Sequence, residues 1–121
     1  MIVVIEDDEL AGRLLLKMLD EFFKDIVTVW LKSTSEAIDF FKNNTLTKKD
    51  LIFLDYYLSD SNAWDLLDAL KTKGITPDAK LILIPGISLT PSEIKKSKGY
   101  KLYKTIVKPI GLQQIKDVLA D

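Results

Sequence analysis

The sequence predicts an α/β fold, in which a parallel sheet of five strands is covered by helices on both faces. Short apolar runs alternate strictly with amphipathic segments, and uninterrupted apolar runs are typical of strands that are buried on both faces. Such an alternation builds a parallel sheet through right-handed crossovers. The 121 residues contain no Pro/Gly/Ser-rich linker, internal repeat or low-complexity segment, so one domain is expected over residues 1–121.

Five apolar runs mark the expected strands. They cover residues 1–5, 26–31, 51–55, 80–84 and 102–107. The run at 51–55 reads Leu-Ile-Phe-Leu-Asp and stops at the carboxylate of Asp55. Because an unpaired carboxylate is costly to bury, Asp55 is expected at the exit of its strand. That end of the strand is where open α/β sheets bind their ligands.

Amphipathic periodicity predicts the first and last helices. In the first helix an apolar stripe recurs every four residues and has two further leucines beside it: Leu10, Leu14, Met18 and Phe22, with Leu15 and Leu19. In the closing helix the residues expected to face inward are Leu112, Ile115 and Leu119.

Capping residues predict the limits of the three helices between them. Ser33 and Glu36 fit a capping box, and so do Thr90 and Glu93, with a proline at the first helical position of the latter helix. The third helix carries Ala63, Leu66, Leu67 and Leu70 on its apolar side. Gly74 is expected to end it. The polar segment 58–62 that precedes it is expected to be a loop.

Composition excludes several classes of function. The chain has no Cys and no His, which excludes disulfides, thiolate catalysis, Ser-His-Asp chemistry and a phosphohistidine carried by this chain. Lys and Arg number 17 against 18 Asp and Glu, so overall charge does not indicate nucleic acid as a partner. No apolar run approaches the ~20 residues of a membrane span, and the first residues lack the pattern of a signal peptide. A cytoplasmic location is therefore expected.

Charged residues follow three of the expected strands. Glu6, Asp7 and Asp8 come after the first strand, Asp55 ends the third, and Lys108 follows the fifth. Carboxyl ends of parallel strands meet at one edge of the sheet, so these side chains are expected to converge there. Carboxylates beside one lysine suit a divalent cation such as Mg²⁺ together with a phosphoryl group. The alternative is a purely structural role, in which the acids after the first strand only stabilise the N-terminus of the helix that follows and Lys108 is only solvated.

On these residues the sequence resembles the CheY-like receiver domains of two-component response regulators, over essentially its whole length. The acidic pair of that family is matched by Glu6-Asp7, its phosphoacceptor by Asp55, and its Lys-Pro by Lys108-Pro109. The family's Leu-Pro-Asp-x-x-Gly loop reads Leu-Ser-Asp-Ser-Asn-Ala at residues 58–63, so its Pro and Gly are replaced.

The resemblance implies a flavodoxin-like (βα)5 three-layer sandwich with the strand order 2-1-3-4-5. It further implies a phosphorelay function, in which Asp55 takes a phosphoryl group from a histidine kinase or phosphotransfer protein and holds it as an aspartyl phosphate. The domain would then be switched by a partner and would not turn over a small-molecule substrate.

The same resemblance implies roles for the other charged residues. Asp7, helped by Glu6 or Asp8, would hold Mg²⁺ together with Asp55 and the backbone carbonyl of Tyr57. Lys108 would pair with the phosphoryl oxygens. The bond between Lys108 and the following proline is a candidate cis peptide, because X-Pro bonds reach the cis state at low cost.

Two positions depart from the family pattern. The Ser or Thr that ends the fourth strand in the family is Pro85 here, which offers neither a hydroxyl nor a backbone N–H. The aromatic switch position three residues before the lysine is Thr105, with Tyr103 two residues away. We therefore expect Asp55 to accept phosphate while the conformational response is small or differently routed. The alternative reading is a receiver-like interaction module that has lost phosphate-dependent switching.

Other features of the chain admit functional and structural readings. The lysines around the fourth helix and fifth strand, Lys95, Lys96, Lys98, Lys101 and Lys104, could meet an output protein or domain, but a solvated face is the simpler reading. Direct binding of nucleic acid by this domain is not expected. Trp30 and Trp64 are expected in the core.

Two further functions of related chemistry are disfavoured. A phosphatase with an aspartate nucleophile needs a second carboxylate two residues later, where Tyr57 stands. A flavin-binding role lacks a Ser/Thr/Gly-rich phosphate loop after the first strand.

Overall fold

The centre of the molecule is a five-stranded parallel sheet in the order β2-β1-β3-β6-β7. The structure is a computed structural model and describes residues 1–120. The strands of this sheet are β1 (Ile2–Ile5), β2 (Thr28–Leu31), β3 (Leu51–Asp55), β6 (Lys80–Ile84) and β7 (Leu102–Thr105). The predicted parallel sheet and the strand order implied by the resemblance are therefore confirmed, although β2 begins and β7 ends two residues inside the predicted runs.

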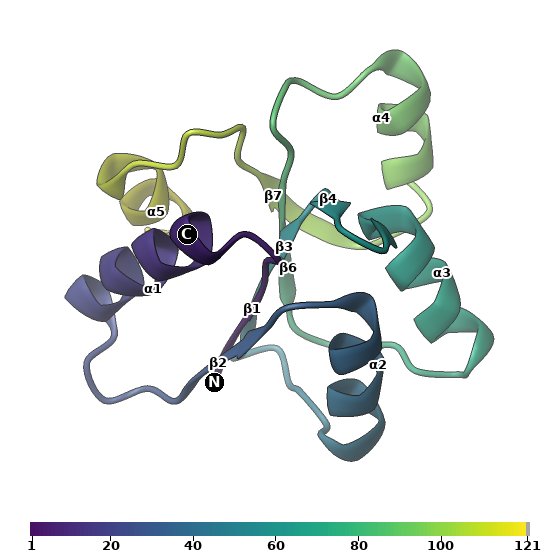
Figure 1. The fold of residues 1–121 in the computed structure, drawn as a ribbon, viewed down its shortest axis with the longest axis horizontal. Coiled ribbons are helices and arrows are strands. Elements are labelled where there is room, and N and C mark those ends of the chain that lie inside the picture. The colour runs from purple at the N-terminus through teal and green to yellow at the C-terminus, as the bar shows by residue number, and fades with distance from the viewer. Residues whose placement is uncertain (121) are drawn as a thin grey trace.

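Five helices form the outer layers: α1 (Glu9–Phe22), α2 (Thr34–Asn43), α3 (Ala63–Thr72), α4 (Pro91–Ser97) and α5 (Leu112–Leu119). Helices α1 and α5 cover one face of the sheet, and α2 and α3 cover the other, with α4 on the same side as α3 (Figure 1). This arrangement is the three-layer α/β sandwich that the sequence predicts.

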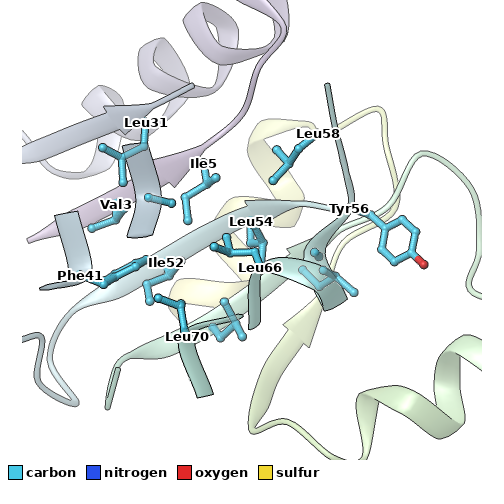
Figure 2. Packing of buried hydrophobic residues seen from close by; sticks show 14 of the residues in the cluster. Val3, Ile5, Leu31, Phe41, Ile52, Leu54, Tyr56, Leu58, Leu66 and Leu70 are labelled. Atoms are coloured by element: carbon cyan, nitrogen blue, oxygen red, sulfur yellow. The ribbon is translucent and has the colours of Figure 1, made fainter. Parts of the chain in front are cut away.

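Side chains of the strands alternate between two hydrophobic cores, because successive residues of a strand point to opposite faces. In β1, Val3 and Ile5 belong to the core that also contains residues of α2 and α3 (Figure 2). Ile2 and Val4 belong to the core on the side of α1 and α5. The central strand β3 alternates in the same way and is buried along its whole length. Burial on both faces explains why its sequence is continuously apolar.

Helix α1 is turned differently from the predicted apolar stripe. Its buried residues are Gly12, Leu15 and Leu19, whereas Leu10 and Leu14 are 68% and 51% exposed. Phe22 is also exposed. The contact with β2 decides this rotation, because a Cβ added to Gly12 would lie only 2.2 Å from an atom of the Trp30 ring. Gly12 therefore faces the sheet, and the predicted stripe residues Leu10 and Leu14 face solvent.

The closing helix α5 also differs at one predicted position. Ile115 and Val118 are its buried residues, and Leu119 packs partly buried against the same core. Leu112, which was expected to face inward, is 49% exposed. It is the first residue of the helix, one turn before the first buried residue, Ile115.

The predicted helix caps are largely present. The Thr90 hydroxyl accepts from the backbone N–H of Glu93, and the Glu93 carboxylate accepts from the N–H of Thr90, which confirms this capping box. Ser33 caps α2 as expected, but Glu36 accepts from the backbone N–H of Lys32, one residue outside the predicted box. Gly74 has φ of +74°, the left-handed conformation that favours glycine after a helix.

The segment after Asp55 is not a plain loop. Two short antiparallel strands, β4 (Tyr57–Leu58) and β5 (Ser61–Asn62), form a hairpin directly before α3. Leu58 is buried in this hairpin and joins the core under α2 and α3. Composition predicts a loop here because Ser59, Asp60 and Asn62 are turn residues, and strands of two residues leave no periodic signal.

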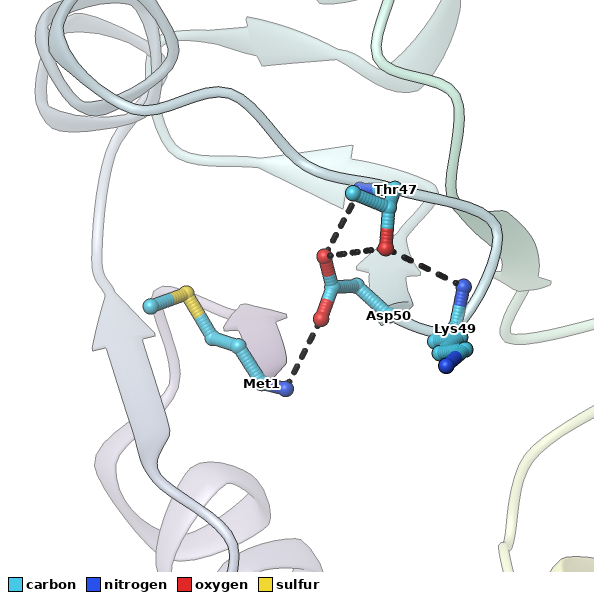
Figure 3. Close-up of polar contacts among 4 residues, drawn as sticks. All are labelled: Met1, Thr47, Lys49 and Asp50. Atoms are coloured by element: carbon cyan, nitrogen blue, oxygen red, sulfur yellow. Dashed lines mark hydrogen bonds and ion pairs between the residues drawn. The ribbon is translucent and has the colours of Figure 1, made fainter.

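Asp50 fixes the entry of β3 beside the start of the chain. One of its carboxylate oxygens lies 2.8 Å from the Met1 ammonium, and the other accepts from the backbone N–H of Thr47 at 2.7 Å (Figure 3). The Met1 ammonium and the Thr47 amide hold the pKa of Asp50 below its usual range. The Leu51 amide also donates to the Met1 carbonyl at 3.1 Å. These contacts align β1 and β3, whose far ends carry the charged residues.

Candidate functional site

Three strand ends bring Glu6, Asp55 and Lys108 together at the carboxyl edge of the sheet. Asp55 ends β3, Glu6 directly follows β1, and Lys108 lies between β7 and α5. The Lys108 ammonium lies 3.1 Å from an oxygen of each of the two carboxylates. Both carboxylates are buried, while the lysine side chain is one-third exposed. The predicted convergence of these residues is thus seen in the structure.

Asp7 completes a group of three carboxylates. One carboxylate oxygen from each of Glu6, Asp7 and Asp55 lies within 4.8 Å of the others. Glu6 Oε2 is buried and has no hydrogen-bond partner within residues 1–120. A buried carboxylate oxygen without a partner is unfavourable, so this atom marks a place where a cation would be stabilised.

Asp8 lies outside this group of three carboxylates. Its side chain caps α1 by accepting from the backbone N–H of Ala11 at 2.7 Å. Asp8 is therefore a helix cap, whereas Glu6 and Asp7 belong to the candidate ion site. The sequence pattern does not separate them, because an acid before a helix suits either role.

The backbone after Asp55 is held on both sides. The Tyr56 N–H donates to the Ile84 carbonyl at 3.0 Å, and the Tyr56 carbonyl accepts from Ala63 at 2.8 Å. Tyr57 then enters the β4–β5 hairpin with its side chain 62% exposed. The chain is thus fixed at the residue next to Asp55, while the Tyr57 side chain faces solvent.

Electrostatics at the site follow from burial and from the shortage of positive charge. Burial raises the pKa of Glu6, and with the Asp55 carboxylate it outweighs the opposing effect of Lys108, so that the Glu6 pKa reaches about 8. Burial lowers the pKa of Lys108, but its two carboxylate neighbours more than offset this effect and raise it. Without a further cation, Glu6 is therefore largely protonated at neutral pH, and a bound divalent cation would favour its ionised form.

Of the two positions that depart from the family pattern, Pro85 contacts this cluster through its backbone. Pro85 is buried, and its carbonyl accepts from the backbone N–H of Lys108 at 2.9 Å. The Lys108–Pro109 bond is cis, as predicted. Thr105 is exposed. Pro85 thus holds the backbone of the lysine but brings no side-chain donor to the site.

In the described part of the chain, neither of the two hydroxyl residues that follow Pro85 hydrogen-bonds to the cluster. The Thr90 hydroxyl is occupied as the N-cap of α4, and Ser88 is exposed in the loop before it.

A cleft of about 610 Å³ opens beside the charged cluster, on the face of the sheet that α1 and α5 cover. Glu6, Asp55 and Lys108 line one part of it, and apolar residues of α1 and of the segment before α5 line much of the rest. The cluster is therefore reached from solvent through a partly apolar opening.

The two tryptophans differ in their surroundings. Trp64 is buried, as predicted, and its ring stacks on Tyr100 at 5.3 Å and meets Tyr56 edge-on at 5.7 Å. Trp30 is only partly buried, and its indole N–H donates to the backbone carbonyl of Glu6 at 2.8 Å. The sequence gives no signal for this contact, because it depends on the pairing of β1 with β2.

The lysines of the fourth-helix region remain on the surface. Lys95, Lys96, Lys98, Lys101 and Lys104 are all exposed. Helix α4 contributes no buried residue to the core, and Ile94 is 47% exposed on it. Over residues 1–120, no helix has the length and apolar character that a membrane span requires.

Comparison with solved structures places the fold with CheY-like response regulator receiver domains. A receiver domain protein from Methanospirillum hungatei superposes with a TM-score of 0.77 and 14% identity, covering 96% of this chain and 87% of that chain. A response regulator from Colwellia psychrerythraea gives 0.74 and 24%, covering 98% and 92%. The N-terminal domain of an uncharacterized protein from Wolinella succinogenes gives 0.75 and 22%, covering 99% and 89%.

The chain therefore has the receiver fold of these neighbours. No protein-family model matches the sequence, and no curated protein is detectably similar to it in sequence. The likeness is one of three-dimensional structure at low sequence identity.

Proposed function

We propose that this chain is a phosphoacceptor receiver domain in which Asp55 accepts a phosphoryl group from a phosphohistidine of a histidine kinase or phosphotransfer protein. The main support is the joint placement of Asp55, Glu6 and Lys108, whose side chains meet at distances of 3.1 Å. Response regulators and receiver domains recur among the structures of the same fold. The domain is a signalling module that a partner enzyme switches.

The site residues fit a magnesium ion. Glu6, Asp7 and Asp55 supply hard oxygen donors close together, and Glu6 Oε2 lacks a protein partner in the part of the chain that is described. The Tyr57 carbonyl completes the proposed set. Bound Mg²⁺ would neutralise charge on the phosphoryl oxygens.

The residues of the chain account for the transfer step. A carboxylate oxygen of Asp55 attacks the phosphorus of the phosphohistidine, so a P–O bond forms while the P–N bond breaks. The electron pair of the P–N bond stays with the imidazole nitrogen, and Asp55 becomes an acyl phosphate. Lys108, already 3.1 Å from Asp55 Oδ1, pairs with the phosphoryl oxygens as their charge develops.

Phosphorylation by a small donor tests this proposal without the partner kinase. The protein is incubated with acetyl phosphate and a magnesium salt, and its intact mass is measured. We expect a gain of one phosphoryl group that Asp55→Asn abolishes and that Asp39→Asn, a change at an exposed acid of α2, leaves intact. No gain in the wild type, or a gain that persists in Asp55→Asn, contradicts the proposal.

Pro85 and Thr105 favour a second candidate, a receiver-like interaction module with altered or lost switching. Pro85 has no side-chain hydroxyl to follow the phosphoryl group, and Thr105 provides no aromatic ring. The exposed lysines around α4 would then serve as a constant surface for an output partner. The acetyl phosphate experiment distinguishes the candidates, because a module that has lost regulation by phosphate gains no phosphoryl group. Backbone amide shifts with and without a beryllofluoride mimic then measure the conformational response. Small shifts in α4 and β7 support altered switching, and large shifts there contradict it.

A further inference from the structure

Strand β2 holds both backbone polar groups of Glu6. The Glu6 N–H donates to the Leu31 carbonyl at 3.0 Å, as the next step of the parallel ladder after Ile5 and Leu31. The Glu6 carbonyl accepts from the indole N–H of Trp30 at 2.8 Å. The side chain of Trp30 thus adds one hydrogen bond between β2 and the chain after β1, at Glu6. The direction in which the chain turns there decides where the following acid points.

Helix α1 leaves room for this indole at Gly12. A Cβ on Gly12 would lie 2.2 Å from Cζ2 of Trp30 and 2.5 Å from Cε2, far inside any real contact. Gly12 is also tied to the junction, because its N–H donates to the Asp8 carbonyl at 2.9 Å. The indole therefore packs against the first turn of α1 at Gly12 and also binds the Glu6 carbonyl at the start of the acidic segment.

A cation–π contact holds the face of the indole ring. The Lys32 ammonium lies 4.4 Å from the centre of the Trp30 ring and 2.6 Å from a carboxylate oxygen of Glu9, the first residue of α1. Lys32 thus links the Trp30 ring to the first residue of α1. Trp30 is accordingly held by the Glu6 carbonyl, Gly12 and Lys32. A side chain fixed in this way can orient the backbone that carries metal-binding carboxylates.

From these contacts we propose that Trp30 is a positioning residue for the carboxylate cluster. Its indole N–H fixes the Glu6 carbonyl, and this sets the path of the junction that presents Glu6 and Asp7 to a divalent cation. The inference rests on the proposed function, since it names a residue that supports the same site. The competing reading is that Trp30 contributes apolar packing alone.

An isosteric replacement separates the hydrogen bond from the packing. Benzothienylalanine at position 30 keeps the bicyclic ring but has sulfur where tryptophan has the N–H. Gly12→Ala provides an independent perturbation, because it displaces the ring without changing Trp30. Trp64→Phe is the matched control, since the Trp64 indole nitrogen has no hydrogen-bond partner among the residues that the structure describes.

The measurement is the Mg²⁺ dissociation constant of each protein, obtained by titrating Mg²⁺ alone against backbone amide resonances. Loss of a group that orients metal ligands typically weakens metal binding by about 10- to 100-fold, and we expect about tenfold for benzothienylalanine at position 30 and for Gly12→Ala. Trp64→Phe is expected to bind within about twofold of wild type, because no bond to the cluster is lost. Wild-type affinity in the benzothienylalanine protein overturns the inference.

A second readout does not need the metal. In the metal-free protein, amide hydrogen exchange at Glu6 and Gly12 is expected to accelerate in the benzothienylalanine variant, while exchange at the centre of β3 is unchanged. Unchanged exchange at Glu6 overturns the inference even if Mg²⁺ does not bind. Absence of Mg²⁺ binding by the wild type, with accelerated exchange at Glu6 in the variant, instead contradicts the proposed function and leaves the positioning contact supported.

Discussion

Replacing Lys108 with methionine removes the ammonium that contacts the two buried carboxylates. Its Nζ lies 3.1 Å from an oxygen of Glu6 and 3.1 Å from an oxygen of Asp55. Methionine keeps the length and apolar stem of the side chain but leaves these two acids facing each other. We therefore expect Lys108→Met to lower the free energy of unfolding of the metal-free protein.

The size of this loss follows from the geometry. At 3.1 Å and an effective dielectric constant of about 20, the contact of Lys108 with the Asp55 carboxylate contributes about 5 kcal/mol before desolvation. Glu6, with a pKa of about 8, is largely protonated at neutral pH and adds a hydrogen bond from Lys108. Desolvation offsets most of this gain, and breaking a fully buried pair costs about 3–5 kcal/mol. The Lys108 side chain is 33% exposed, so we expect a loss of about 2 kcal/mol, or a melting temperature lower by roughly 8 °C.

Urea unfolding followed by circular dichroism, with and without Mg²⁺, measures the effect. Mg²⁺ is expected to stabilise Lys108→Met more than the wild type, because it supplies the positive charge that the variant lacks. Lys116→Met, at an exposed lysine of α5, is the control and should unfold like the wild type. A loss below about 0.5 kcal/mol, the range of ordinary surface substitutions, would refute the reasoning.

Three further predictions concern stability. Asp50→Asn should cost about 1 kcal/mol at neutral pH. Because the partners of Asp50 lower its pKa, this contribution is present above the unfolded-state pKa and is lost as the pH falls, so urea unfolding of the two proteins should converge in acid. Thr90→Ala removes the α4 cap, worth about 1 kcal/mol, and should accelerate amide exchange in α4, which has no buried residue, more than elsewhere. Gly74→Ala should cost about 1–2 kcal/mol in thermal unfolding because φ is positive there, whereas Gly86→Ala, also in open space but without a positive φ, should be nearly neutral. Wild-type stability of Asp50→Asn at neutral pH, unchanged exchange in α4 of Thr90→Ala, or equal thermal stability of Gly74→Ala and Gly86→Ala would contradict these expectations.

Much of the fold is predictable from the sequence because its signals are local. The continuous apolar run of β3 and the capping box at Thr90 each determine one element without help from the rest of the chain. The rotation of α1 is not predictable in this way. Apolar residues occupy a wide arc of that helix, and the choice of Leu15 over Leu14 depends on the close approach of Gly12 to Trp30.

The candidate site is predictable in outline for a similar reason. Glu6, Asp55 and Lys108 each stand at a strand end, and parallel topology brings strand ends together. The separate role of Asp8 as a helix cap requires the backbone geometry of the junction. The contact of Trp30 with the Glu6 carbonyl requires the register of β1 against β2, in which Val4 pairs with Trp30.

Chemical mapping of the phosphoryl group tests the central proposal most directly. Protein treated with acetyl phosphate and Mg²⁺ is reduced with borohydride, which converts an aspartyl phosphate to homoserine, and its peptides are sequenced by mass spectrometry. We predict homoserine at position 55 alone. Homoserine at another acid such as Asp7 or Asp60, or none at all in protein that has bound Mg²⁺, would show that Asp55 is not the phosphoacceptor.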